Sequence, residues 1–253
     1  MTFRNLSKVA LCAWLLPLSM LLAADDNTTT TRKLHRPLVG FRVEYFPLRF
    51  FKIGTTTATT TSPAASYTYT ATSNSPKFFV GPIVEYRWTS HVSFGTELHF
   101  HHVDYDQTTT LLSGTPPPNS SFDTRTKTTI VQDSKINYWE LPLLAHYYGF
   151  RPSGRLSRAY LTGGVEYRHM GRIRTGNTYT YPDGTSDYNE TPPAANRHNQ
   201  FGAVVGVGMR FLDDFNVKLA PEVRYIRWFG TTLQGQAFQS AASQIEAGVG
   251  LSF

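Results

Sequence analysis

The chain is built from segments in which apolar residues alternate with polar, charged or small ones. In PLVGFRVEY, residues 37–45, Phe41 and Val43 share one face of an extended strand, and Arg42 and Glu44 share the other. Successive side chains of a strand point to opposite sides, so a period of two predicts β-structure with two different faces. Amphipathic helical spacing is almost absent, and we therefore expect an all-β fold.

Eight segments of this kind recur along the sequence. They are PLVGFRVEYFPLRFF, FFVGPIVEYRW, VSFGTELHFHHV, INYWELPLLAHYY, AYLTGGVEYRH, NQFGAVVGVGMRF, FNVKLAPEVRYIRW and the terminal IEAGVGLSF. Each is near the ~9–11 residues that a tilted membrane-spanning strand requires, and their number is even. This pattern predicts an eight-stranded antiparallel up-and-down transmembrane β-barrel.

Long and short connections alternate between the segments. The long ones cover about 51–77, 106–134 and 170–198, and a medium one covers about 230–242. Between them lie the tight turns TSH and LDD and the link GFRPSGRLSR. An up-and-down barrel with long extracellular loops, short periplasmic turns and both chain ends in the periplasm predicts this alternation.

The first residues have the layout of a secretory signal peptide. Arg4 and Lys8 precede an apolar stretch, which ends in small residues and then acidic ones. A positive start, a short apolar core and small residues before the cut are typical of such a signal. We expect a signal peptide at 1–24, a short periplasmic segment at 25–36 and the barrel at 37–253.

Composition narrows the possible functions. The single cysteine, Cys12, falls inside the predicted signal peptide, so the mature chain offers neither a disulfide framework nor a thiol nucleophile. Removal of 1–24 takes away two basic residues, leaving 22 basic against 18 acidic residues. That mild excess does not indicate nucleic acid as a partner. Phosphate-binding, dinucleotide and zincin motifs do not occur, and no cofactor is expected.

The polar face of the segments carries an unusual number of charges. Seven segments place a glutamate there, and the sixth supplies an arginine instead. An eight-stranded barrel is just wide enough for side chains to fill, and an unpaired buried charge is costly. We expect an ion-pair network that plugs the lumen; a catalytic or proton-conducting carboxylate array is the alternative. The expected members are Arg42, Glu44, Glu85, Arg87, Glu97, Glu140, Glu166, Arg168, Arg210, Lys218, Glu222, Arg224 and Glu246.

Aromatic residues near the segment ends predict two girdles at the membrane surfaces. The periplasmic girdle is expected to contain Trp88, Tyr147, Phe211, Phe215 and Phe253. The outer girdle is expected to contain Trp139, Tyr167, Phe201, Tyr225 and Trp228.

Together with the signal peptide, IEAGVGLSF, YWELPLLAHY and LAPEVRYIRW resemble the small outer-membrane β-barrels of Gram-negative bacteria, of the OmpA/OmpX and PorT-like types. The resemblance implies a monomer in the outer membrane, in contact with lipid and lipopolysaccharide. It also implies recognition by the barrel assembly machinery through Val249, Leu251 and Phe253. The periplasmic domain that OmpA-like proteins often carry after the barrel is expected to be absent.

Two weaker constellations involve histidines. His99 and His101 are two residues apart on the inward face, a spacing that can hold a metal. No further ligand is fixed by spacing, so packing is the preferred interpretation and no metal is expected. His91 and Ser93 have the residue types of a lipid hydrolase, but they lie at a predicted periplasmic turn with no acid fixed nearby.

We therefore expect a non-enzymatic protein with a structural or surface-interaction role through Thr/Tyr-rich loops such as TTTATTTSPAASYTYTATSNS and NTYTYPDGTSDYNET. A small channel or a transport- or secretion-associated barrel is the first alternative. An outer-membrane lipid-modifying enzyme is the second. A soluble periplasmic lipocalin-like binding barrel is the rival fold, and it would place apolar residues inside and charges outside.

Overall fold

A computed structural model describes residues 37–47, 50–115, 123–148, 158–190, 197–212 and 217–253. The predicted signal peptide and the segment 25–36 lie outside these ranges. Within the described residues, no helix is long and apolar enough to cross a membrane.

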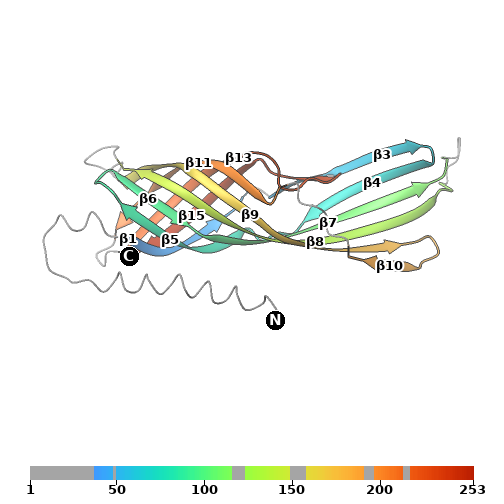
Figure 1. Ribbon diagram of the computed structural model, residues 1–253, viewed down its shortest axis with the longest axis horizontal. Coiled ribbons are helices and arrows are strands. Elements are labelled where there is room, and N and C mark those ends of the chain that lie inside the picture. Colours follow the sequence, from blue (N-terminus) through green and yellow to red (C-terminus); the bar gives the residue numbers. More distant parts are fainter. Residues whose placement is uncertain (1–36, 48–49, 116–122, 149–157, 191–196, 213–216) are drawn as a thin grey trace. The chain divides into compact units, whose positions relative to one another are not determined.

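The described residues form β-strands almost throughout (Figure 1). The strands are β1 (Pro37–Tyr45), β2 (Phe51–Ile53), β3 (Thr55–Thr61), β4 (Ala64–Ser73), β5 (Phe78–Arg87), β6 (Val92–Glu97), β7 (His99–Ser113), β8 (Thr126–Tyr147), β9 (Ala159–Thr180), β10 (Ser186–Asn189), β11 (Asn199–Met209), β12 (Phe211–Leu212), β13 (Lys218–Trp228), β14 (Phe238–Ser240) and β15 (Ser243–Ser252).

Eight antiparallel walls close into a ring. In order they are β1, β5, β6 continued by β7, β8, β9, β11, β13 and β15, and β15 pairs back with β1. The closing register places Gly40 opposite Ser252 and Tyr45 opposite Ala247. Each wall therefore pairs with a neighbour on both sides, as a strand protein in lipid needs, because every backbone polar group must be satisfied internally. The prediction of an eight-stranded antiparallel barrel is confirmed.

The two faces of the ring have opposite chemistry. Outward side chains are apolar and exposed, with Phe41 at 58 %, Val165 at 51 % and Val205 at 58 %. Inward side chains such as Arg42 and Glu44 are buried. A lipocalin-like barrel requires the inverse arrangement, so the soluble rival does not fit this chain. The faces instead suit a lipid surround, where a charge at the midplane costs ~2–4 kcal/mol.

Two strands run far beyond the barrel. β8 and β9 have 22 residues each, about twice what a membrane crossing needs. Their outer halves join a six-stranded sheet in the order β3-β4-β7-β8-β9-β10. Figure 1 shows this sheet continuing away from the barrel. We call it the extracellular sheet; it replaces much of what the sequence pattern indicated as long loops.

An apolar layer separates the charged lumen from the extracellular sheet. The short ribbon of β2 and β14 packs Phe51 and Phe238 against Tyr105, Ile136 and neighbouring residues, all buried. Along β8 the order is Glu140 in the lumen, then Tyr138 and Ile136 in this layer. We call it the apolar cap, and its members are Phe51, Ala71, Val103, Tyr105, Ile136, Tyr138, Met170, Ile173, Leu233, Ala237 and Phe238.

Trp228 corrects the predicted outer girdle. Its side chain is 2 % exposed and points inward, where its indole N–H donates to Gln244 Oε1 at 3.2 Å. The physical reason is the period of two, since Trp228 has the same parity as Arg224 on β13 and therefore shares its inward face. Trp88 and Phe201 are exposed as a girdle requires, and Phe215 lies outside the described residues.

Candidate functional site: the barrel lumen

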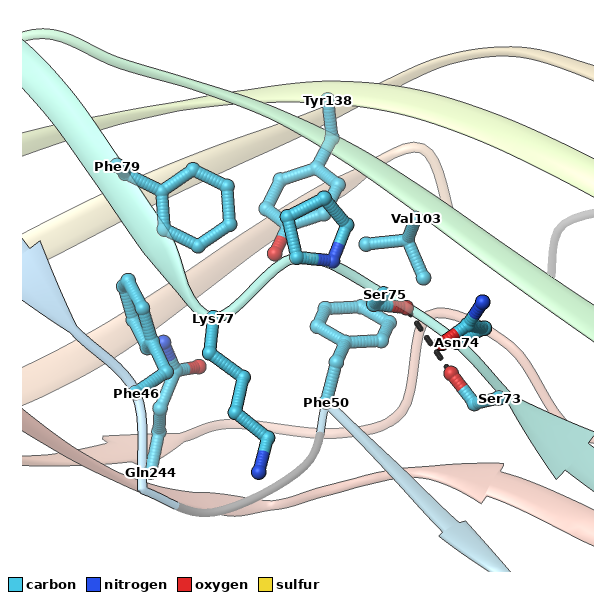
Figure 2. A pocket seen from close by; sticks show the side chains of 11 residues that line it. Phe46, Phe50, Ser73, Asn74, Ser75, Lys77, Phe79, Val103, Tyr138 and Gln244 are labelled. Atoms are coloured by element: carbon cyan, nitrogen blue, oxygen red, sulfur yellow. Dashed lines mark hydrogen bonds between the residues drawn. The ribbon is translucent and has the colours of Figure 1, made fainter.

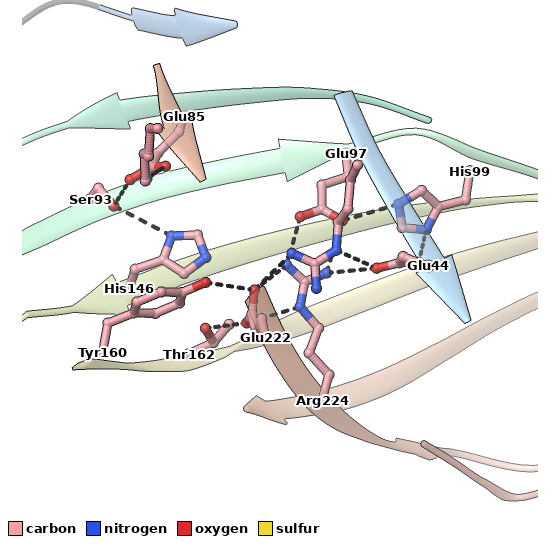
Figure 3. A network of polar contacts seen from close by, with 12 residues as sticks. Glu44, Glu85, Ser93, Glu97, His99, His146, Tyr160, Thr162, Glu222 and Arg224 are labelled. Carbon is pink, nitrogen blue, oxygen red and sulfur yellow. Dashed lines mark hydrogen bonds and ion pairs between the residues drawn. The ribbon is translucent and has the colours of Figure 1, made fainter. Parts of the chain in front are cut away.

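The middle of the lumen holds two arginines among three glutamates. Figure 3 shows one of these arginines, Arg224, together with Glu44, Glu97 and Glu222. Arg42 Nε donates to Glu44 Oε1 at 2.5 Å, and its Nη1 donates to Glu222 Oε2 at 2.8 Å. Arg224 makes a two-pronged contact with Glu97, at 2.8 and 2.6 Å. All five side chains are buried, and they come from walls that lie far apart in the sequence. Removing one partner of such a group leaves a buried charge uncompensated.

The periplasmic end of the lumen centres on Glu85. Lys218 forms an ion pair with Glu85 Oε2, while the hydroxyls of Ser93 and Tyr148 donate to Glu85 Oε1 at 2.6 and 2.8 Å. One cation and two hydroxyl donors occupy most of the acceptor sites of this carboxylate.

Arg87 and Arg210 also lie at the periplasmic end of the lumen, but their surroundings differ from those of Lys218. Both are half-buried, and their guanidinium carbons lie 5.8 and 4.4 Å from the centroid of the Tyr148 ring. Stacking on an aromatic face satisfies a cation in part while its polar edge remains in contact with water. These two predicted members therefore lie at the periplasmic mouth rather than in the buried ion pairs.

The extracellular end of the lumen is organised by Arg168. Its guanidinium pairs with Glu140, donates to Gln244 Oε1 at 2.8 Å and lies 3.6 Å from the Trp228 ring centroid. His101 approaches the other oxygen of Glu140, with Nε2 2.7 Å from Oε2. The remaining predicted members, Glu166 and Glu246, lie beside Glu140 and are buried.

Two glycines make room for the arginines. A Cβ added at Gly248 would lie 2.9 Å from Arg42 Nε, and one added at Gly206 would lie 3.0 Å from Arg224 Cγ. Contacts this short require the neighbour to shift, so a larger residue at either position would displace a guanidinium.

Neutral donors complete the network, and the sequence pattern did not single them out. Thr162 donates to Glu222 Oε1 at 2.5 Å and Tyr160 to Glu222 Oε2 at 3.2 Å, while Gln200 donates to the Gly230 carbonyl oxygen at 2.6 Å. Each shares a strand face with predicted lumen residues, so the period of two contained the signal that would have found them.

The hydrolase pair His91 and Ser93 is separated in the structure. His91 lies exposed at the turn and contacts Ser90, while Ser93 faces the lumen and is 0 % exposed. The nearest imidazole nitrogen is Nδ1 of His146, 3.4 Å from Ser93 Oγ (Figure 3). The adjoining cavity has a volume of about 30 Å³, which leaves room for only about two water molecules. A lipid chain does not fit in that space.

A larger pocket lies where the barrel wall opens near the extracellular end. β5 pairs with β6 only from Ile83 to Arg87. After β6 the chain continues as β7, and β7 pairs with β4 rather than with β5. The pocket beside this gap measures about 260 Å³ (Figure 2). Its lining combines aromatic rings with polar side chains, and comprises Phe46, Phe50, Ser73, Asn74, Ser75, Pro76, Lys77, Phe79, Val103, Tyr138 and Gln244.

The outward face of the extracellular sheet carries hydroxyl groups in register. One row crosses all six strands, and its members are Thr57, Thr68, Thr110, Thr129, Thr180 and Ser186. The next row contains Thr55, Thr70, Thr108, Val131, Thr178 and Tyr188. With strands ~4.8 Å apart, these two rows form a regular hydrogen-bonding band, and Asp133, Lys135 and Arg174 add charge beside it on the same face.

The comparisons with known proteins agree with this geometry. A family model described as "Outer membrane protein beta-barrel domain" matches residues 47–230, which is more than half of the chain. No curated protein matches the sequence. The matched range covers most of the ring and the extracellular sheet, and it implies a place in the outer membrane. The chain belongs to the outer membrane protein beta-barrel domain family.

Proposed function

We propose that this protein is a monomeric, non-enzymatic outer-membrane barrel with a closed lumen, and that it works by presenting the extracellular sheet to a surface partner. The observation that carries the proposal is the length of β8 and β9. Each has 22 residues, and about half of that length lies beyond what a membrane crossing needs. The excess forms an ordered sheet, and ordering that many residues has a conformational cost that a passive loop would not incur.

The interior supports a closed lumen. Ion pairs fill it from Lys218 at the periplasmic end to Arg168 at the extracellular end, and the apolar cap lies above them. A path for ions would have to break these contacts and also cross a layer containing Ile136 and Leu233, both almost fully buried. This favours a binding or structural role over diffusion through the barrel.

The sheet offers two features that a partner can use. Its hydroxyl rows are neutral and favour a hydrogen-bonding partner rather than a strongly charged one. At one edge, every residue of β3 is exposed, and the strand TTTATTT contains no charge or proline. A flat, uncharged edge of this kind pairs readily with another extended chain. We propose that the partner is a protein segment that adds a strand along β3.

Site-specific photocrosslinking in intact cells tests this proposal. A photoreactive residue at Thr57 on β3 should give a protein adduct of discrete mass, and the same residue at the lipid-facing Val165 should give none. An adduct of twice the mass would identify a second copy as the partner. A folded protein that gives no protein adduct at Thr57 or elsewhere on the sheet would contradict the proposal.

A small channel or transport-associated barrel is the second candidate. The pocket of about 260 Å³ at the wall gap favours it, because the pocket reaches inward beside Phe46 and Phe79. His101 packs under both rings and against Tyr138, with ring centroids 4.0–5.5 Å apart. Passage through the pocket would therefore require these rings to separate, and a conductance measurement decides between the two candidates.

A further inference from the structure

Two histidines and three glutamates meet at the extracellular end of the lumen. His99 and His101 come from β7, Glu140 from β8, Glu166 from β9 and Glu246 from β15, and each is at most 1 % exposed. Ligand atoms of His99, His101 and Glu140 all lie within 4.8 Å of one another. Those of Glu140, Glu166 and Glu246 do so as well. Glu140 therefore belongs to both triads.

The charges of this group do not balance. Among the described residues, Arg168 is the only arginine or lysine in an ion pair with Glu140, Glu166 or Glu246, and it pairs with Glu140. When the three carboxylates are ionised and the two histidines are neutral, two buried negative charges remain without an ion-paired cation. Burial of unpaired charge is expensive, so this group has a strong electrostatic demand for a positive partner.

The imbalance extends to the whole lumen of the described chain. Seven glutamates are buried there, against four buried arginine and lysine side chains. The buried glutamates are Glu44, Glu85, Glu97, Glu140, Glu166, Glu222 and Glu246, and the buried cations are Arg42, Arg168, Lys218 and Arg224. The excess is greatest at the extracellular end, because within the described ranges Arg168 is the one arginine or lysine that forms an ion pair there.

Several of the donor atoms also make no hydrogen bond of normal geometry. These atoms are both ring nitrogens of His99 and of His101, Oε2 of Glu140 and Oε1 of Glu166. The ring nitrogens of His99 lie 3.3 and 3.0 Å from carboxylate oxygens of Glu44 and Glu97, so His99 would turn from those contacts to bind an ion at this group. His101 Nε2 lies 2.7 Å from Glu140 Oε2, so the two atoms are close without an aligned hydrogen between them. Buried polar atoms are nearly always hydrogen-bonded, and lone-pair atoms that converge in this way lack a common cationic partner.

We propose that His99, His101 and Glu140 bind one divalent transition-metal ion inside the barrel, with Glu166 and Glu246 balancing its charge. Two imidazoles and a carboxylate suit zinc and similar borderline ions. Donor atoms within 4.8 Å of one another reach ~2.0–2.2 Å from a common ion by small side-chain rotations. Arg168 stays on the other oxygen of Glu140 and orients that ligand.

The second histidine-containing triad, Glu44, Glu97 and His99, is a poorer site. Arg42 and Arg224 already contact both of its carboxylates, so it has its cations. A metal at His99, His101 and Glu140 would instead join β7 to β8 directly below the apolar cap. Its role is structural: it stabilises the extracellular end of the lumen and the base of the extracellular sheet.

Cobalt serves as the probe, because its visible absorption reports imidazole coordination. The full-length barrel, refolded in metal-free detergent without an affinity tag, should bind one Co²⁺ per chain. His99→Gln and His101→Gln should each weaken binding by about 10-fold or more. His102→Gln is the matched control, since His102 lies on the same strand but points outward, with its side chain 44 % exposed. That variant should bind cobalt as the wild type does.

Unfolding of the wild type provides a readout that needs no variant. The apparent melting temperature should be higher in Zn²⁺ than in chelator, because an ion that binds only the folded state stabilises it. Folded wild-type barrel that binds no cobalt and melts identically in zinc and chelator would overturn the proposal. Cobalt binding that is reduced as much by His102→Gln as by His101→Gln would also overturn it.

Discussion

The two halves of β9 are one continuous strand in two environments. In the barrel half, Glu166 and Arg168 are buried in the lumen while Val165 is exposed on the outward face. In the outer half, the exposed positions are Arg172, Arg174, Thr178 and Thr180. The same backbone therefore has charge inside and hydrocarbon outside at one level, and charge followed by neutral hydroxyls outside at the next.

This difference separates what the fold requires from what the surface is free to vary. In the barrel half, lipid forbids outward charge and the narrow lumen forbids unpaired inward charge. In the outer half, neither constraint applies to the outward face, and an ordered hydroxyl surface has to be explained by its use. The predictions below compare matched positions on the two sides of this boundary.

The largest effect is expected in the lumen. Arg224→Ala should destabilise the barrel by about 3–5 kcal/mol or prevent its assembly, because it removes the two-pronged partner of buried Glu97 and leaves Glu222 with Arg42 alone. The urea midpoint of the refolded barrel in detergent measures this. Arg227→Ala is the control, since Arg227 lies on the same strand but is exposed and contacts Ser243. Equal midpoints for the two variants would contradict the ion-pair network.

A charge placed on the outward face should have a large effect at membrane depth only. Val165→Arg should cost ~2–4 kcal/mol in a lipid bilayer, because Val165 faces hydrocarbon. Thr178→Arg, on the outward face of the same strand, should change stability by less than ~0.5 kcal/mol. Folding titrations in vesicles give both values. A similar cost at both positions would contradict a membrane boundary that lies between Val165 and Thr178.

The terminal strand should affect the amount of assembled protein. Val249, Leu251 and Phe253 all point outward and are exposed. Phe253→Asp should lower folded protein in the outer membrane severalfold while synthesis is unchanged, as measured by gel mobility with and without heating. Phe253→Tyr retains the aromatic ring and should assemble normally. Unchanged levels of the Asp variant would count against recognition of this strand by the assembly machinery.

The smallest effect is expected at the tip of the sheet, between β9 and β10. The hydroxyl and backbone N–H of Thr185 donate to Asp183 and hold the pKa of that carboxyl below its usual value. Because this pKa is lowered on folding, the ionised carboxylate stabilises the turn at pH values above those at which aspartate ordinarily titrates. That stability is lost as the pH falls through the folded-state pKa. The Thr185 amide shift should follow this titration, and Asp183→Asn should abolish it.

Much of the lumen was predictable because period two assigns faces reliably. Glu97, Glu140 and Arg224 were placed inward on that basis alone. Their partners were not, since Arg224 meets Glu97 across 127 positions, and which inward residues meet depends on the tilt and stagger of the walls. Trp228 was misplaced because an aromatic near a strand end was given more weight than its parity.

The extracellular sheet was the hardest region to predict. The sequence pattern indicated long connections at about 51–77, 106–134 and 170–198, where the structure has the strands of this sheet. β3 was not expected, because TTTATTT has no alternation and both of its faces are exposed. A strand whose two faces are both polar and exposed shows no alternation of apolar and polar residues in the sequence. Its position is fixed by pairing with β4, and the sequence alone does not specify that pairing.

Single-channel recording tests the central claim most directly, which is that the lumen is closed and the protein acts through its outer surface. Refolded wild-type barrel, shown to be folded by its heat-dependent gel mobility, should give no steady conductance steps in a planar bilayer. Arg224→Ala, if it folds, should also give no steady steps, because the apolar cap above the ion-pair network stays in place. Steady steps from the wild type would contradict the closed lumen and make transport the function to pursue.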